Sequence, residues 1–522
     1  MLGTRRSVRL SLAIVALVAC ADYSVLRERA MAEKIPLEIA IKDLMPHDVW
    51  QNFYDVTQVP RYSHHEEKIR SFLVQFGNNL GLQTIVDGAG NVLIRKPATP
   101  GMENRKGVIL QAHMDMVAKT APGTIHDFDN DPIVAYVEDD WVKAEGTTLG
   151  ADDGIGLALA MAVLQSNSMA TGPLEALFTV DEEDGMSGAL GLQPDLLTGD
   201  ILINLDGEVE GEFTNGSAGG ELGYIRVTYD ETGVPRGMGS YRVSVQGLNG
   251  GHSGLNINQG QGNAAKLLVR FLKDADGGYG LRVAQIDAGS AANAIPSEGS
   301  ALVLIPAGRE TEFLDHVAEY EGILKNELGA VETTLSVRAV AADLPHRVMH
   351  EKSQRDLVNA LYGTPQGVIR MSDTVPDLVE TSTNMGVVRA SNRVMEVENR
   401  IRSSVDTSID DVGTMLSSVW ELAGGKAEFS GRYPGWKPNP DSPIVHLMSD
   451  VYRILYGVDP TVVAIHAGLE CGTIYGTYPN LDMISIGPTL EKVHSTDEKM
   501  FVPSVKQVMD LLVETLGRIP VR

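Results

Sequence analysis

Cysteine is scarce in this sequence: only Cys20 and Cys471 occur among its 522 residues. Two cysteines exclude a disulfide framework, and they also exclude a zinc site built from thiolates. Any metal ion that the chain binds must therefore be held by His, Asp and Glu. We expect Cys471 to be a small buried apolar residue rather than a nucleophile, because the sequence shows no pairing of His with Cys.

Positive charge is also in short supply, since 43 Lys and Arg stand against 69 Asp and Glu, a formal net charge of −26. A chain this acidic repels nucleic acid and anionic membrane surfaces, so partners of either class are not expected. Part of the charge could be local, in a carboxylate cluster that a divalent metal ion neutralises. The length is too great for one compact core and suggests two or three domains.

Long hydrophobic runs are missing as well. The apolar run from Leu10 to Ala19 follows three arginines and is too short to span a bilayer, but it fits a signal segment. If the residues ending at Cys20 are a lipoprotein processing site, the protein is exported and anchored through Cys20. If translation instead starts at Met31, residues 1–30 are an extension and the protein is cytoplasmic. We expect no other transmembrane segment.

Short apolar runs alternate with helical segments from about residue 44 onward. Strands are expected at 108–110, 174–180 and 201–205, and a buried helix of small residues at 154–164. This order predicts an α/β domain with a mainly parallel sheet. Ligands of such sheets bind at the carboxyl ends of the strands, so polar residues at those ends are candidates for function.

Two local signals refine this first domain. Ser63-His64-His65-Glu66 has the spacing of a capping box and predicts the start of a helix. Ile69, Phe72, Leu73 and Phe76 follow at helical spacing, so we expect one buried helix face. Asp87-Gly88-Ala89-Gly90-Asn91 predicts a turn between two short strands.

The pattern changes after about residue 220. A strand at 241–245 and a helix containing Leu267, Leu268, Phe271 and Leu272 are followed later by a strand at 394–401 and a helix to about 422. This repeated order suggests an inserted α+β domain of two similar halves. The predicted division is 1–33 for an N-terminal extension or signal-like segment, 34–219 and 435–522 for a catalytic domain in two parts, and 220–434 for the insertion.

His113-Met114-Asp115 is the first of five clusters of metal-type ligands. Residues i and i+2 of a strand point to the same side, so His113 could bind a metal ion while Asp115 orients its ring. Taken alone, this pattern is more often a hydrogen-bonded pair at the end of a strand.

The other four clusters each have a plainer interpretation, as a helix cap, a solvated acidic loop or a surface histidine. They are Gly150-Ala151-Asp152-Asp153-Gly154, Asp181-Glu182-Glu183-Asp184-Gly185, Asn204-Leu205-Asp206 and Val493-His494-Ser495. Most of the clusters follow predicted strands, so their combination indicates a site for two divalent ions such as Zn²⁺, Co²⁺ or Mn²⁺. A pair of such ions assists hydrolysis, and an adjacent Glu can accept the proton of the attacking water.

The motifs resemble those of the M20 metallopeptidases, and within that family they are most similar to bacterial dipeptidases acting on aminoacyl-histidine substrates. The resemblance covers about Leu44 to the C-terminus. It is carried by the clusters above together with Gly250-Gly251-His252-Ser253-Gly254 and His466-Ala467-Gly468-Leu469-Glu470-Cys471-Gly472. It implies a phosphorylase/hydrolase-like di-metal peptidase domain with an inserted lid domain.

The resemblance assigns roles to individual residues of the metal site. His113 and Asp206 bind one ion, His494 and Glu183 bind the other, and Asp152 bridges both. Glu182 is the general base for a metal-bridging water, and Asp115 supports the ring of His113. The cofactors implied are two divalent metal ions, with Zn²⁺ expected first and Co²⁺ or Mn²⁺ as alternatives.

The inserted domain resembles the lid of the same family. By this resemblance His252 stabilises the oxyanion, Asn293 and Arg402 bind the substrate's C-terminal carboxylate, and Gly468 offers its backbone. The insertion is about twice the size of a simple dimerising lid, so a homodimer is allowed but not required for catalysis. Three features depart from the family pattern: Asp153 where Asn is common, the extra acids Asp181 and Asp184, and the N-terminal extension.

The expected activity is hydrolysis of unblocked dipeptides, including Xaa-His substrates of the carnosine type. The partner is then a dipeptide substrate, without nucleic acid and without membrane contact by the main body. Other M20 activities, such as a tripeptidase or an N-acyl amino-acid deacylase, share the same metal site. A non-catalytic peptide-binding lipoprotein is a further alternative, which the intact set of ligands and base disfavours. Phosphate-ester chemistry is disfavoured because the motifs contain no basic phosphate cradle.

Overall fold

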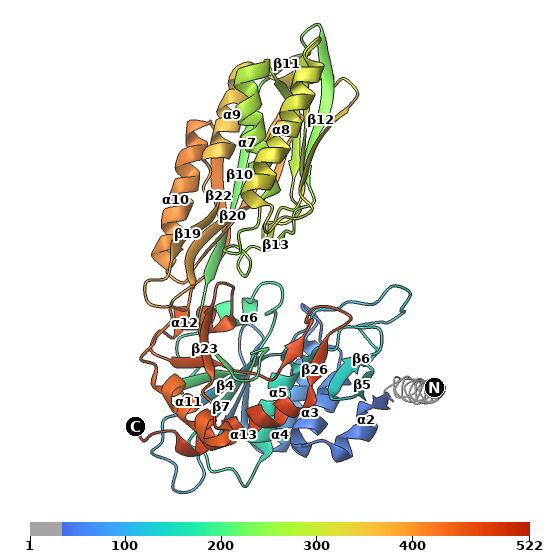
Figure 1. Ribbon diagram of the computed structural model, residues 1–522. Coiled ribbons are helices and arrows are strands. Elements are labelled where there is room, and N and C mark those ends of the chain that lie inside the picture. The colour runs from blue at the N-terminus through green and yellow to red at the C-terminus, as the bar shows by residue number, and fades with distance from the viewer. Residues whose placement is uncertain (1–33) are drawn as a thin grey trace, which may run out of the picture. The chain divides into compact units, whose positions relative to one another are not determined.

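The computed structural model describes residues 34–522 (Figure 1). Cys20 and the other signals of the predicted extension therefore lie outside the described residues. Two compact units are present: the first comprises the described residues up to Asp184 with Asn204–Gly211 and Ile486–Arg522, and the second comprises Gly185–Ile203 and Glu212–Ser485. Within residues 34–522, no helix is both long enough and apolar enough to cross a membrane.

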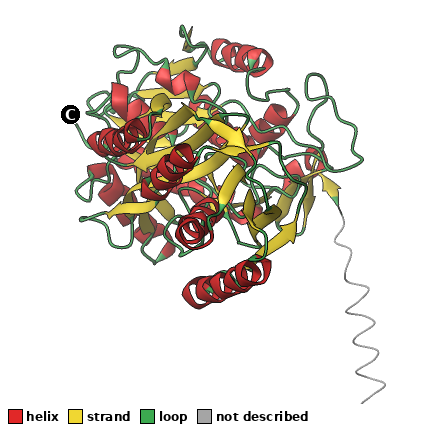
Figure 2. Ribbon diagram, turned by 90° about the horizontal axis from the view of Figure 1, so that it is seen from above, coloured by secondary structure: helices red, strands yellow, loops and turns green. Residues whose placement is uncertain are grey.

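Both units mix helices and strands (Figure 2). The helices of the first unit are α2 (Leu37–Ala40), α3 (His47–Thr57), α4 (Glu67–Asn79), α5 (Ala151–Gln165) and α13 (Val502–Arg518). Its central strands are β2 (Gln83–Val86), β3 (Val92–Lys96), β4 (Val108–His113) and β7 (Leu174–Thr179). A separate five-stranded sheet joins β1 (Ile35–Pro36), β5 (Ala135–Glu138), β6 (Trp141–Ala144), β26 (Lys499–Phe501) and β25 (Leu490–Glu491) in that order.

The centre of the first unit is apolar. Every residue of β4 and β7 is buried, and so is every residue of α5 from Ala151 to Leu164. A helix that is apolar on all sides must be enclosed by other elements, which explains the run of Ala, Leu, Met and Val in α5. Asp152 and Asp153 have non-helical backbone angles, so the regular helix begins at Gly154, as predicted.

Strand directions in the sheets are mixed. In the first unit β4 pairs with β7 in parallel, whereas β3 is antiparallel to both β7 and β2. The turn predicted at 87–91 joins β2 to β3. In the second unit β9 (Glu212–Ser217) is parallel to β23 (Thr461–Ile465) and antiparallel to β24 (Asp482–Ser485). The predicted strands β4 and β7 are parallel as expected, but antiparallel pairs occur in both units, so the fold is mixed α/β.

The start of α4 also differs from the prediction. The helix begins at Glu67, and the Ser63 hydroxyl donates to Asp115 Oδ2 at 2.8 Å instead of capping the helix. The Glu66 carboxylate accepts the His64 amide at 2.9 Å, so it bonds within the turn before the helix. Ile69 and Leu73 are fully buried as expected, while Phe72 and Phe76 are only partly buried.

A nine-stranded antiparallel sheet dominates the second unit. Its main path runs β17 (Ser336–Ala341), β12 (Met238–Gln246), β16 (Gly299–Pro306), β14 (Arg282–Ala288), β20 (Val379–Ser391), β21 (Val394–Ser403), β10 (Gly219–Thr228) and β22 (Lys426–Tyr433), and β19 (Gly367–Met371) pairs with β20. One face is covered by α7 (Ala264–Tyr279), α8 (Glu310–Leu328), α9 (Glu351–Gly363) and α10 (Asp406–Leu422) (Figure 1). Phe271, Phe313 and Trp420 are fully buried in this helix–sheet core.

The remaining elements of the second unit include α6 (Ser187–Leu190), β13 (Gly251–His252), β15 (Ala294–Ile295), α11 (Pro443–Tyr456) and α12 (Glu470–Thr477). Strand β8 (Ile201–Asn204) also belongs to it, except for Asn204, which is part of the first unit. Cys471 in α12 is completely buried, as the sequence predicted. The short pair of β13 and β15 places His252 opposite Ala294, one residue beyond Asn293. Two regions that are about 40 residues apart in the sequence are thereby brought together.

Candidate metal centre

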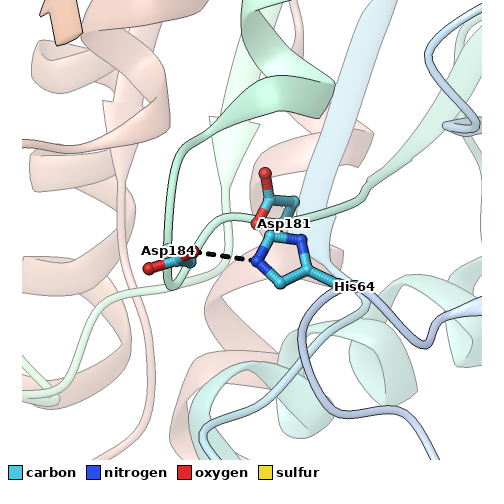
Figure 3. Close-up of side chains that lie close together, drawn as sticks. All are labelled: His64, Asp181 and Asp184. Carbon is cyan, nitrogen blue, oxygen red and sulfur yellow. Dashed lines mark hydrogen bonds and ion pairs between the residues drawn. The ribbon is translucent and has the colours of Figure 1, made fainter.

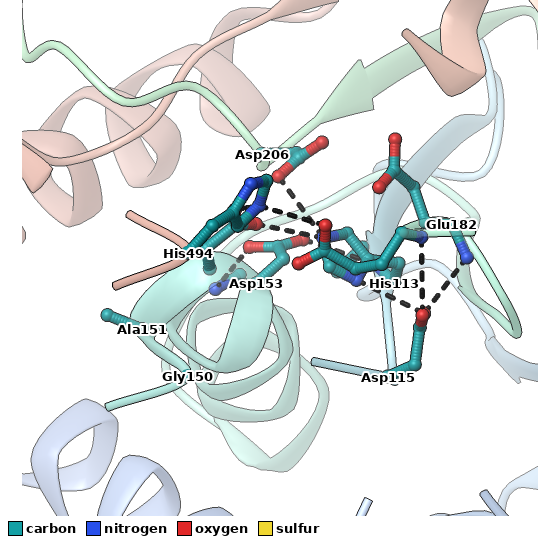
Figure 4. A network of polar contacts seen from close by, with 12 residues as sticks. His113, Asp115, Gly150, Ala151, Asp153, Glu182, Asp206 and His494 are labelled. Atoms are coloured by element: carbon teal, nitrogen blue, oxygen red, sulfur yellow. Dashed lines mark hydrogen bonds and ion pairs between the residues drawn. The ribbon is translucent and has the colours of Figure 1, made fainter. Parts of the chain in front are cut away.

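Five segments of the first unit bring carboxylates and imidazoles to one place (Figure 4). His113 ends β4, Glu182 and Glu183 follow β7, and Asp206 follows β8. Asp152 and Asp153 lie at the beginning of α5, and His494 lies in the loop between β25 and β26. The structure therefore brings together the residues predicted from the His113, Asp152, Glu182–Glu183, Asp206 and His494 clusters.

Asp152 lies between the two histidines. His113 Nε2 is 2.9 Å from Asp152 Oδ1, and His494 Nε2 is 3.0 Å from Asp152 Oδ2. On the outer sides of this group, His113 Nε2 is 3.5 Å from Asp206 Oδ1 and His494 Nε2 is 2.8 Å from Glu183 Oε2. The order Asp206, His113, Asp152, His494, Glu183 is the connectivity expected of two adjoining ligand sets that share one carboxylate.

The electrostatics of the group show a demand for positive charge. Burial disfavours the charged form of Asp152, but hydrogen bonds with His113 and His494 outweigh it and lower the pKa of Asp152 far below its ordinary value. Hydrogen bonds with Asp152 and Glu183 raise the pKa of His494 to about 11 despite the opposing effect of burial. These carboxylates therefore favour positive charge between them, which divalent metal ions can supply.

The donor atoms fit divalent metal ions. One ligand atom each from His113, Asp152 and Glu183 lie within 4.8 Å of one another, and the same is true of His113, Asp153 and Asp206. Glu183 Oε1 is buried and makes no hydrogen bond within residues 34–522. Such an atom is costly unless it has a partner, and nitrogen and carboxylate donors are those that Zn²⁺ accepts.

Asp153 is placed differently from Asp152. Its Oδ2 accepts the backbone amide of His113 at 3.2 Å, and its Oδ1 accepts the amide of Gly156 at 3.0 Å. Burial raises the pKa of Asp153 well above its ordinary value, and the negative charge of Asp206 adds to this effect. Both carboxylate oxygens therefore hold the backbone around the site, so Asp152 is the better placed of the two acids to receive metal ions.

Asp115 supports the loop that carries Glu182 and Glu183. Its carboxylate accepts the backbone amides of Glu182 at 3.0 Å and Glu183 at 3.3 Å, and Oδ1 lies 3.3 Å from His113 Nδ1. Burial opposes the charge on Asp115, but the hydrogen bond with His113 and other bonds lower its pKa to about 2. The carboxylate therefore stays charged and fixes both the ring of His113 and the acidic loop.

Sequence reasoning missed two buried supports of the centre. The Glu498 carboxylate accepts the backbone amides of Leu149, Gly150 and Ala151 at 2.8–3.0 Å and approaches that of Asp152 at 3.4 Å. The Arg61 guanidinium is 3% exposed and donates to the carbonyls of Met114, Asp115 and Gly150. Neither residue belongs to a motif, because the partners of each are distant in the sequence.

Four further residues with predicted roles lie in the second unit. Arg402 Nη2 lies 3.1 Å from His252 Nε2, Arg402 Nη1 donates to the Tyr433 hydroxyl at 3.1 Å, and Arg402 Nε donates to Ser253 Oγ at 3.3 Å. The Asn293 carbonyl accepts the Ser253 amide at 2.8 Å. Gly468 lies beside the ring of Tyr433. The predicted His252, Asn293, Arg402 and Gly468 are therefore linked, directly or through Ser253 and Tyr433.

His252 is neutral in this group. Partial burial lowers its pKa to about 4, and the positive charges of Arg402 and Arg400 contribute in the same direction. The neutral ring can therefore accept a hydrogen bond from Arg402 at Nε2. In the other tautomer Nε2 carries the proton and can donate it in a hydrogen bond. His466, which the sequence placed only within a motif, is buried near Arg402 and makes a 2.7 Å hydrogen bond with Ser382 Oγ.

A protein-family model agrees with this arrangement. Residues 109–518 match the family described as Peptidase family M20/M25/M40. The chain belongs to this family. The resemblance inferred from the motifs is thereby confirmed, and the segments that build the metal centre all lie within the matched residues.

Two relatives match the M20 chain over nearly their whole length. The cytosol non-specific dipeptidase of Escherichia coli (strain K12) is 44% identical over 482 residues, which are 92% of this chain and 99% of that protein. The crystal structure of aminoacylhistidine dipeptidase from Vibrio alginolyticus is also 44% identical, with a TM-score of 0.87, and the match covers 92% of this chain and 98% of that one.

A more distant structure shares the fold alone. The aminopeptidase PepT from Bacillus cereus has a TM-score of 0.57 at 17% identity, and the match covers 91% of this chain and 99% of that one. The M20 architecture therefore extends well beyond the relatives with a high identity. An identity this low carries no information about what the M20 chain acts on.

Proposed function

We propose that this M20 peptidase is a dipeptidase that hydrolyses unblocked dipeptides, including Xaa-His substrates of the carnosine type. The observation that carries the proposal is the 44% identity, over nearly full length, to a non-specific dipeptidase and to an aminoacylhistidine dipeptidase. A tripeptidase or an N-acyl amino-acid deacylase would use the same metal centre. Neither of the two relatives with 44% identity is described as a tripeptidase or a deacylase.

The proposal assigns two divalent metal ions to the centre. His113, Asp206 and the shared Asp152 would hold one ion, and His494, Glu183 and Asp152 would hold the other. When bound, such a pair supplies Lewis acidity for the scissile carbonyl and lowers the pKa of water. We propose Zn²⁺ as the native ion, with Co²⁺ or Mn²⁺ as alternatives that accept the same donors.

Glu182 is proposed as the general base. Its backbone is fixed by Asp115, and its carboxylate points away from Asp115 (Figure 4). In the reaction Glu182 would accept the proton of the attacking water and then donate it to the leaving amine. Glu183, the adjacent residue, would remain bound to metal, so two consecutive carboxylates would have different roles.

The second unit is proposed to bind the substrate. The fork of Arg402, assisted by Asn293, suits the C-terminal carboxylate of a dipeptide because a guanidinium can pair with two oxygens at once. His252 would donate a hydrogen bond to the oxyanion, as its neutral ring permits, and Gly468 would offer backbone groups. Recognition of the C-terminal carboxylate close to the scissile carbonyl would explain a preference for dipeptides.

The predicted lid of two similar halves is supported by the topology of the nine-stranded sheet. In one half β12, β14, β16 and β17 appear in chain order, with α7 after the first strand and α8 after the third. In the other half β10, β20, β21 and β22 alternate with α9 and α10 in the same way. Read from its outer edge toward the centre of the sheet, each half has the order fourth, first, third and second strand. We therefore retain 220–434 as the proposed lid, between catalytic parts 34–219 and 435–522.

We also make proposals for the oligomeric state and the location of the protein. A lid built from two halves could serve its own chain, so we propose that a homodimer is permitted but not needed. We propose a cytoplasmic location if translation starts near Met31, in keeping with the cytosolic name of the Escherichia coli relative. An exported lipoprotein anchored through Cys20 is the alternative.

Hydrolysis of a defined substrate panel tests the function. Protein stripped of metal and then reloaded with Zn²⁺, Co²⁺ or Mn²⁺ is given free dipeptides including carnosine, a tripeptide, and an N-acetylated amino acid. We expect metal-dependent cleavage of the free dipeptides and little cleavage of the others. Cleavage of the acetylated compound alone would indicate a deacylase, preference for the tripeptide would indicate a tripeptidase, and binding of peptides without any cleavage would indicate a binding protein.

A further inference from the structure

The first unit contains another cluster of metal-type ligands, formed by His64, Asp181 and Asp184 (Figure 3). His64 Nε2 is 2.8 Å from Asp184 Oδ2, and His64 Nδ1 is 3.4 Å from Asp181 Oδ1. One ligand atom from each of the three residues lies within 4.8 Å of the others. None of the three residues has a role in the proposed two-metal centre.

Asp181 provides an observation that the cluster alone does not. Its side chain is only 9% exposed, and its Oδ1 atom accepts no hydrogen bond within residues 34–522. The ring of His64 faces this oxygen at a distance too long for a normal hydrogen bond. A buried carboxylate oxygen without a donor costs free energy, so this atom requires a partner that the protein does not supply.

Negative charge is in excess around His64. Glu66, which is buried, accepts the backbone amide of His64 and adds a third carboxylate to Asp181 and Asp184. Within the described chain, the ion pairs recorded for Asp181 and Asp184 are both with His64. Even a protonated imidazole leaves this group negative, so a further cation would be attracted to it.

We propose that His64, Asp181 and Asp184 bind an additional divalent transition-metal ion, separate from the two ions of the proposed centre. One imidazole and two carboxylates are donors that Zn²⁺, Mn²⁺ or Co²⁺ accepts, with bonds of about 2 Å. One ligand atom of each residue lies within 4.8 Å of the others, and rotation of the exposed His64 and Asp184 side chains would bring one ring nitrogen and both carboxylates to a shared ion. Because His64 and Asp184 are exposed, water can complete the ligand shell.

The position of the ligands gives the outer ion a consequence for the acidic loop. Asp181 and Asp184 flank Glu182 and Glu183, so an ion held with His64 would fix both ends of this four-residue loop. On the inner side of the loop, Asp115 already holds the two amides between them. The outer ion would thereby position the general base. This consequence rests on the proposed function, whereas the binding site does not.

Metal stoichiometry tests the outer site. Wild type and the variants His64→Gln and Asp184→Asn are stripped of metal, dialysed against micromolar Zn²⁺ and analysed for bound zinc per chain. The matched control is His65→Gln, because His65 is an equally exposed neighbour whose Nδ1 lies 3.5 Å from Asp129. Thermal unfolding of all four metal-free proteins shows whether each variant is folded.

We expect wild type and His65→Gln to bind one more ion than His64→Gln or Asp184→Asn. If a variant still binds the ion, its affinity should fall at least about tenfold. Mutation of a residue that only supports a metal ligand already costs about that much. Equal zinc content in all four proteins would overturn the outer site, as would an additional ion that binds only at millimolar zinc. The difference in bound zinc between wild type and variant can be interpreted even if the two-metal centre is empty. Failure of the outer site can therefore be distinguished from failure of the proposed function.

Discussion

At the scale of single residues, Glu182 and Glu183 show how two adjacent carboxylates acquire different environments. Glu183 Oε2 lies 2.8 Å from His494 Nε2, and the Glu183 side chain is almost completely buried. Glu182 is held through its backbone amide, and its carboxylate points away from the Asp115 carboxylate that holds it (Figure 4). The second of these acids is therefore placed to join the proposed ligands, and the first is the acid proposed for proton transfer.

The Glu182→Ala variant tests this division of roles. We expect turnover of a free dipeptide to fall by about 10²- to 10⁴-fold, the usual contribution of a general base, while zinc content stays unchanged. Glu145→Ala is the control. Glu145 is exposed, and within residues 34–522 its one ion pair is with Lys34. Full activity of Glu182→Ala would remove this residue from the base role, and a loss of zinc would make it a ligand instead.

At the scale of elements, the turn before α5 is the best example of a local structure fixed from a distance. Three consecutive amides donate to Glu498 at 2.8–3.0 Å, and the Gly150 carbonyl accepts from Arg61. Glu498 is nearly 350 residues away in the sequence. Its charge lies at the amino-terminal end of a helix, where it also interacts favourably with the helix dipole.

We expect Glu498→Gln to destabilise this turn, because a neutral amide accepts weaker hydrogen bonds and brings a donor toward the backbone N–H groups. The loss of a charged acceptor should lower the free energy of unfolding by roughly 1.5–3 kcal/mol. Displacement of Asp152 should weaken zinc binding by about 10- to 100-fold. Chemical denaturation measures the first effect and zinc titration the second. Glu491→Gln is the control, because Glu491 is exposed and its one ion pair within residues 34–522 is with Lys499. An unchanged zinc affinity would contradict a supporting role for Glu498.

The same elements show which features the sequence could reveal. The strands that end at His113 and before Asp181 were predicted because apolar runs stop at polar residues, and α5 was predicted because its residues are uniformly small and apolar. The prediction of a capping box at Ser63 was wrong because the Ser63 hydroxyl donates a hydrogen bond to Asp115, 52 residues later. Glu498 and Arg61 were missed for the same reason: hydrogen bonds between distant segments leave no local pattern.

At the scale of the whole molecule, strand order was beyond the sequence, although the chemistry of the centre was not. Repeated strand–helix order suggested two similar halves, but nothing local indicated that β14 pairs with β20 to continue one nine-stranded sheet. By contrast, the clusters of the metal centre were recognisable because most of them lie where a strand ends or a helix begins. Their assembly within the first unit concentrates negative charge in a chain with a net charge of −26.

This concentration of charge leads to a prediction about metal removal. Without metal ions, the carboxylates of Asp152, Glu183 and Asp206 repel one another, so chelation should loosen the segments that carry them. Amide hydrogen exchange should become faster at 149–153, 181–184 and 493–495, and slow again when Zn²⁺ is restored. An ion at about 100 times its dissociation constant stabilises the folded state by about 2.7 kcal/mol, enough to change exchange rates about a hundredfold. Strands β20 and β21 of the second unit contain none of the proposed ligands and should exchange at the same rate in both states. Equal acceleration in all segments would indicate general unfolding instead of a local metal centre, and no change anywhere would show that the centre does not hold metal.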